Sequence, residues 1–235
     1  MCTSFLFRGN DTLIAMNYDN NGKNLKLAPY SKDLFLATLH SFGKDRPLFG
    51  VRSDGIMVNQ QVVNECEDED GKFRIGFKVI HTAQLLNKVL KKRMPIDKLA
   101  KYLDTHKIVN PPNNSLHTII ACAEKQSWII EPGRGTVCYP PNQRYIAMSN
   151  CPVCDHEKTG EWKGFGVDRQ LKVEETLKNA PETFGVKEAF ALLDQVHQID
   201  ELWTTEFSFV YSFNENKVYY CYDHKFDEIQ EYQMQ

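Results

Sequence analysis

The order of strand-like and helix-like segments is the feature of this sequence that constrains the fold most. The strand-like runs, in which apolar residues alternate or cluster between turn-forming residues, are 3–8, 12–18, 34–39, 48–58 (with a turn at 53–55), 116–121, 127–130, 145–148, 205–213 and 218–222. Helix-like apolar spacing occurs between these blocks, at 79–90, at 96–103, after Gly166 and at 186–193. Segregated blocks favour an α+β fold over an alternating parallel α/β fold. We expect helices outside two mostly antiparallel sheets, in one domain that spans residues 1–235.

Composition adds limits on function. The 235 residues are 42% hydrophobic and 25% charged, as in an ordinary globular protein, and the net charge of −3 gives no electrostatic reason to expect nucleic acid or an anionic membrane as a partner. No apolar run approaches the length of a membrane span. The seven cysteines are an odd number spread along the chain, which favours reduced thiols. These features predict a cytoplasmic protein.

Cys2 stands at the head of the first strand-like run, where packing gives a strand little reason for a cysteine. If Met1 is removed, Cys2 carries a thiol and an α-amine within a few bonds of each other. An α-amine has a pKa of about 7.7–8.0 and a free cysteine thiol one of about 8.5, so the amine can accept the thiol proton near neutral pH. Thiolate attack on an amide carbonyl would give an acyl-enzyme, which water would release as the acid.

Besides Met1-Cys2-Thr3, five further segments of the sequence form an ordered set of short motifs. They are Asn17-Tyr18-Asp19, residues 55–59, residues 115–120 followed by 128–131, residues 149–152, and residues 203–205 with Ser208. Together with the start of the chain, this ordered set resembles the choloylglycine hydrolase family, the linear amide C–N hydrolases that include penicillin V acylases and bile salt hydrolases. The set covers nearly the whole chain, although no single segment is very specific.

The resemblance implies a four-layer αββα N-terminal-nucleophile hydrolase fold with Cys2 as the nucleophile. Asp19 would accept hydrogen bonds from the α-amine, and Asn59 and Asn150 would stabilise the tetrahedral oxyanion. A small acyl amide would be the substrate, with neither a metal nor an organic cofactor, and homo-oligomerisation stays open. From the residues alone, Asp19 could instead cap the turn that follows it, and each Asn could be an ordinary strand-end residue.

The sequence departs from the family at two arginines. Met16 stands where an arginine usually precedes the Asn-x-Asp segment, and residues 220–222 have no arginine where the final strand commonly supplies a second. A site without these guanidinium groups would favour the thiolate less. Arg169 resembles an arginine of related acyl-transfer members and could bind a substrate carboxylate. A surface or helix-end position is the alternative that we favour for Arg169.

Other functions stay open. Cys151 and Cys154 have the spacing of a redox pair, but the order of elements supplies no βαβ context, and with His156 they make only half of a zinc site. The same thioester on Cys2 could be captured by an amine, which would make the protein an acyltransferase. The fold could also persist as a binding protein that has lost its catalytic activity.

Overall fold

Two antiparallel sheets form the centre of the molecule. The computed structural model describes residues 2–22, 25–41, 44–200 and 202–235, and within these residues one sheet has six strands and the other seven. The first sheet runs β12 (Tyr145–Met148), β1 (Cys2–Arg8), β2 (Thr12–Asn20), β13 (Thr204–Ser212), β14 (Lys217–Tyr222), β15 (Gln230–Gln233). The second runs β11 (Gly135–Tyr139), β10 (Ser127–Glu131), β9 (Leu116–Cys122), β6 (Ile56–Val62), β5 (Lys44–Arg52), β4 (Leu34–Ser41), β3 (Leu25–Ser31).

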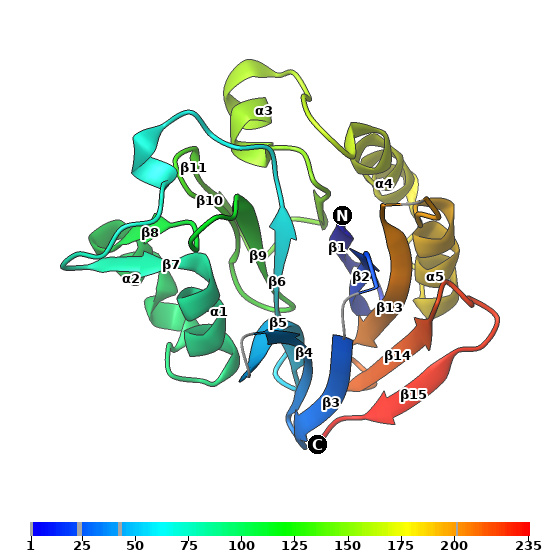
Figure 1. Ribbon diagram of the computed structural model, residues 1–235. Coiled ribbons are helices and arrows are strands. Elements are labelled where there is room, and N and C mark those ends of the chain that lie inside the picture. Colours follow the sequence, from blue (N-terminus) through cyan, green and yellow to red (C-terminus); the bar gives the residue numbers. More distant parts are fainter. Residues whose placement is uncertain (1, 23–24, 42–43, 201) are drawn as a thin grey trace.

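The helices lie outside the two sheets, except for α3, which is at one end of them (Figure 1). The α-helices are α1 (Thr82–Leu90), α2 (Leu99–Thr105), α3 (Val153–Thr159), α4 (Val167–Asn179) and α5 (Val186–Gln195). The short elements are η1 (Glu69–Gly71), η2 (Ile96–Lys98) and the parallel pair β7 (Val79–His81) with β8 (Lys107–Val109). Helix α1 packs on β5 and β6, α4 on β12 and β1, and α5 on β13 and β2.

Strand β1 shows how the sequence pattern builds the layers. Successive side chains of a strand point to opposite faces of the sheet. Leu6 therefore lies in the apolar cluster between the sheets, while Phe5 and Phe7 lie in the cluster that the six-stranded sheet shares with α4 and α5. A third cluster joins the seven-stranded sheet to α1 and α2. The four-layer αββα arrangement of the α+β class is thus confirmed.

The elements that the sequence pattern does not predict are mostly at the sheet edges. The turn at residues 53–55 separates β5 from β6 as predicted, but β3, β11 and β15 are additional strands, and each is at the edge of its sheet. Strand β15 is Gln-Glu-Tyr-Gln and is largely exposed, so it has no apolar alternation to detect. Helix α3 is also additional, a seven-residue helix that begins after Pro152.

None of the helices in the described part of the chain combines the length with the apolar composition that crossing a bilayer requires.

Candidate active site

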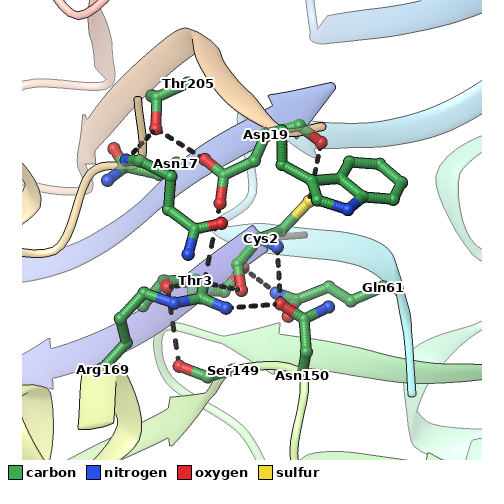
Figure 2. Close-up of polar contacts among 12 residues, drawn as sticks. Cys2, Thr3, Asn17, Asp19, Gln61, Ser149, Asn150, Arg169 and Thr205 are labelled. Carbon is green, nitrogen blue, oxygen red and sulfur yellow. Dashed lines mark hydrogen bonds and ion pairs between the residues drawn. The ribbon is translucent and has the colours of Figure 1, made fainter. Parts of the chain in front are cut away.

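Cys2 is the first residue of β1 and faces the space between the two sheets. Its Cα is in register with that of Tyr18 on β2, and its side chain belongs to the inter-sheet cluster, with the residue only 5% exposed. The Sγ atom is 4.0 Å from the backbone oxygen of Asp19. Figure 2 shows Cys2 at the centre of a group that contains Asp19, Asn150 and Arg169. The structure therefore brings four of the five predicted site residues together.

Asp19 lies near the end of β2, where β13 runs alongside. The Thr205 hydroxyl donates a hydrogen bond to Oδ1 of Asp19 at 2.6 Å, and Nη1 of Arg169 is 3.5 Å from Oδ2. Burial raises the pKa of Asp19 to about 6, although the Thr205 hydrogen bond and the Arg169 charge act in the opposite direction. This carboxyl group therefore changes its charge close to neutral pH.

Asn150 holds the backbone nitrogen of Cys2. Its Oδ1 accepts hydrogen bonds from Cys2 N at 2.8 Å and from Nη2 of Arg169 at 2.9 Å, and its Nδ2 donates to the backbone oxygen of Val62 at 2.6 Å. The opposite orientation of the amide would place its NH₂ group against two donors and its oxygen against a carbonyl. The oxygen of Asn150 is thus directed at the nitrogen that would be the α-amine after removal of Met1.

Arg169 is in the first turn of α4, so the helix-end position that we favoured from the sequence is correct, but the residue is only 4% exposed and is not at the surface. Its Nη1 donates to the backbone oxygen of Cys2 at 2.9 Å and to Oγ1 of Thr3 at 2.8 Å, in addition to the contacts with Asp19 and Asn150 described above. Its terminal nitrogens are therefore directed at protein groups.

Gly166 makes room for this arginine. It precedes α4 with φ at +72°, and a Cβ atom there would lie 2.6 Å from Nη2 of Arg169. Glycine tolerates both the left-handed backbone and the close approach.

Met16, which stands where the family usually has an arginine, belongs to the apolar core. Met16 is fully buried in the inter-sheet cluster and is in register with Ser4 of β1 and Phe209 of β13. In β14, Cys221 packs in the cluster beneath α4 and α5. A guanidinium group nevertheless reaches the site, from α4 rather than from β2 or β14. The sequence signal that could have assigned this role is the glycine directly before the α4 helix.

The thiol itself is strongly desolvated. Burial raises the pKa of Cys2 to about 11, and the charge of Asp19 acts in the same direction, while Arg169 acts against it. A thiol in this environment needs a proton acceptor in place before it can attack a carbonyl. The nitrogen held by Asn150 is on the same residue, which fits the self-contained pair expected for an N-terminal cysteine.

Asn59 contacts β1 at Ser4, two residues along the strand from Cys2. Its Nδ2 donates to Oγ of Ser4 at 2.9 Å, and the residue is fully buried on β6. Gln61, two residues along β6 and therefore on the same face, donates to the same hydroxyl at 2.8 Å and to the backbone oxygen of Met148 at 3.3 Å. Sequence reasoning assigned no role to Gln61, Thr3 or Thr205, although Figure 2 draws all three around Cys2.

Cys151 and Cys154 are buried free thiols. Burial raises the pKa of Cys151 to about 12 and that of Cys154 further still, which opposes thiolate chemistry. His156 stacks on the ring of Trp162, with the ring centroids 3.9 Å apart. Within the part of the chain that the structure describes, no group of three or more His, Cys, Asp and Glu residues is arranged to hold a metal ion.

Comparison with solved structures places this geometry in a known fold. A mutant of the conjugated bile acid hydrolase from Clostridium perfringens is similar at a TM-score of 0.72 and 16% identity, with 100% of this chain and 92% of that chain covered. The penicillin V acylase from Agrobacterium tumefaciens is similar at a TM-score of 0.65 and 17% identity, with 94% of this chain and 83% of that chain covered.

This chain has the N-terminal-nucleophile hydrolase fold. The likeness to bile acid hydrolases and penicillin V acylases that the sequence pattern indicated is thus confirmed at the level of the fold. A scan against protein-family models finds no match for the sequence, and a search of curated proteins finds none either. The fold likeness is therefore carried by the tertiary structure.

Proposed function

We propose that this protein is a cysteine N-terminal-nucleophile amidase that hydrolyses a non-peptide C–N bond of a small acylated amine or amino acid. The observation that supports the proposal most is the hydrogen bond from Cys2 N to Asn150 Oδ1, in a site where Asp19 and Arg169 surround the same residue. Solved structures of similar fold include a conjugated bile acid hydrolase and a penicillin V acylase, which agrees with a carbon–nitrogen bond as the target.

The proposed reaction starts with removal of Met1, which turns the Cys2 nitrogen into a free amine. This amine takes the proton of the thiol, and the sulfur forms a bond to the carbonyl carbon of the substrate. The tetrahedral intermediate then collapses: the C–N bond breaks, the ammonium group returns the proton to the leaving nitrogen, and a thioester stays on Cys2. Attack by water on the thioester releases the carboxylic acid and restores the thiol.

Each surrounding residue has a part in this proposal. Asn150 Oδ1 orients the amine. Asp19, whose backbone oxygen is 4.0 Å from Cys2 Sγ, would stabilise the protonated amine through its negative charge. Arg169 fixes the carbonyl of Cys2 and the amide of Asn150. A Cys2 whose backbone is held on both sides keeps the sulfur and the amine in one geometry through both half-reactions.

We retain Asn59 and Asn150 as oxyanion donors in the proposal. Asn150 Nδ2 donates to Val62 O and Asn59 Nδ2 donates to Ser4 Oγ, so each would have to exchange a partner to reach the oxyanion.

Mass spectrometry and kinetics test the proposal. The intact mass of the purified protein should lack Met1, and addition of an acyl amide should give a transient thioester adduct on Cys2. A suitable panel contains penicillin V, a conjugated bile acid and several N-acyl amino acids. Cys2→Ala should abolish turnover with the fold intact, as monitored by circular dichroism. Turnover that survives in this variant would refute the assignment of the nucleophile.

Two alternatives are outcomes of the same experiments. If an added amine acceptor yields an acylated amine in place of the acid, the protein is an acyltransferase that uses the same thioester. A protein that retains Met1 and binds acyl amides without forming an adduct is a binding protein with this fold.

A further inference from the structure

A second buried carboxylate lies outside the group around Cys2. Glu131, the last residue of β10, is 1% exposed, and its Oε1 accepts hydrogen bonds from Nδ1 of His117 and from the backbone N–H of Val153, each at 2.9 Å. Its Oε2 accepts from the backbone N–H of Cys154, also at 2.9 Å. Helix α3 packs on β10 and β11 at this point (Figure 1). Glu131 therefore attaches the start of α3 to the seven-stranded sheet.

The segment that Glu131 holds is the one that carries Asn150. Asn150 lies three residues before Val153, in the connection from β12 to α3. On the other side of Asn150, the backbone N–H of Ser149 donates to Oε1 of Gln170 on α4 at 2.8 Å. The connection is thus fixed at both ends, by α4 on one side and by β10 on the other.

Asn150 needs this restraint because its side chain makes three hydrogen bonds in different directions. Its Oδ1 faces the Cys2 nitrogen and Arg169, and its Nδ2 faces Val62 on the opposite sheet. A small displacement of the connection would weaken these bonds, including the one to Cys2, because each partner is on a different element from Asn150. In the proposed reaction, such a displacement would misplace the proton acceptor.

We propose that Glu131 is a positioning residue of the Cys2 site, which acts by holding the backbone amides of Val153 and Cys154 and so fixing the side chain of Asn150. The consequence for turnover rests on the function proposed above, but the geometric statement does not. His117 supports the arrangement, because its contact with Glu131 favours the ionised carboxylate, whose two oxygens can accept from both amides at once.

Glu131→Gln tests the proposal. A glutamine offers one oxygen and one NH₂ group, so one of the two backbone amides loses its acceptor. We expect the side-chain amide protons of Asn150 to exchange with solvent at least tenfold faster by NMR. The side-chain amide of Asn59, buried against Ser4, is the internal reference and should not change. Glu157→Gln, an exposed position on α3, is the matched control variant and should leave both amides as in the wild type.

A second variant keeps the test decisive if Glu131→Gln does not fold. Val153→Pro removes one of the two amide donors at the first position of α3, where proline is tolerated, and Pro152 already has the extended backbone that must precede a proline. Val153→Ala is its control, since it loses the same side-chain packing but keeps the N–H group. Faster Asn150 exchange in the proline variant than in the alanine variant supports the proposal.

Kinetics separate this proposal from the proposed function. If the protein is an amidase, Glu131→Gln should lower kcat by roughly tenfold and change KM less than twofold, because the substrate does not contact Glu131. If the wild-type protein shows no turnover, the exchange rates decide alone. Asn150 exchange at the wild-type rate in Glu131→Gln, or equal rates in Val153→Pro and Val153→Ala, would overturn the proposal.

Discussion

Asp19 and Glu131 are both buried carboxylates at the ends of strands, yet their pKa values move in opposite directions. Burial raises the pKa of each, but Glu131 accepts from His117 and from two backbone amides, and these partners hold its pKa below the ordinary value. Asp19 has the Thr205 hydroxyl and a longer contact with Arg169, and its pKa rises to about 6. The strength of the donors around a carboxylate therefore decides whether it stays ionised as a structural anchor or changes charge near neutral pH.

Asp19→Asn should produce the largest effect, in turnover. The variant loses the negative charge that stabilises the protonated amine, so we expect kcat to fall by about 10²–10⁴-fold, the range typical of lost proton-transfer assistance. Stability at pH 7 should not fall in parallel, because the ionised carboxylate is itself poorly solvated there. Steady-state kinetics with a substrate from the panel and urea unfolding measure the two effects. Wild-type turnover in this variant would remove Asp19 from the mechanism.

Arg169→Met should come next, with stability as the main readout. It leaves the oxygens of Cys2, Thr3 and Asn150 without the guanidinium donors, and loss of one partner of a buried ionic contact typically costs about 3–5 kcal/mol. Arg169→Lys should lose less stability but still lower kcat, since a single ammonium nitrogen cannot reproduce the separate positions of Nη1 and Nη2. Lys172→Met, at an exposed position on α4, is the control. Equal urea midpoints for Lys172→Met and Arg169→Met would show that the arginine contacts contribute little.

The pH dependence of stability should distinguish the two carboxylates. With a folded pKa of about 6 against 3.8 for the ordinary group, Asp19 binds more protons in the folded state between these values, so its contribution to stability falls as pH rises through this window. The difference in the free energy of unfolding between wild type and Asp19→Asn should change by about 2 kcal/mol from pH 4 to pH 7. Urea unfolding at several pH values measures it. A difference that is constant with pH would mean that burial does not raise this pKa.

Thr205→Val should give the smallest effect. Valine keeps the shape of threonine but removes the hydroxyl that donates to Asp19, so the pKa of Asp19 should rise above about 6. Because the proposed mechanism needs ionised Asp19, the acidic limb of the pH–activity profile should move to higher pH by the same amount. Thr204→Val, at the neighbouring position, is the control and should keep the wild-type profile. An unshifted limb in Thr205→Val would show that Asp19 does not set it.

The sequence predicted the central elements better than the peripheral ones. Strands β1, β2, β9 and β13 are central and buried on both faces, and their apolar runs are long enough to recognise. The edge strands β11 and β15 bury little apolar surface, so selection for packing leaves no periodic pattern in them. Of the predicted site residues, Cys2 and Asp19 lie on these central strands, whereas Asn150 follows β12, a buried strand at a sheet edge.

The sequence by itself determined the α+β class and the unusual place of a cysteine beside the start of the chain, because both depend on local patterns and on the order of segments. Only the tertiary structure decided that Arg169 reaches Cys2, that Asn150 directs its oxygen to the Cys2 nitrogen, and that Glu131 holds the connection carrying Asn150. The partners in these contacts are 167, 148 and 22 residues apart in the chain. Hydrogen-bond geometry over such separations depends on how the layers pack, which no local pattern specifies.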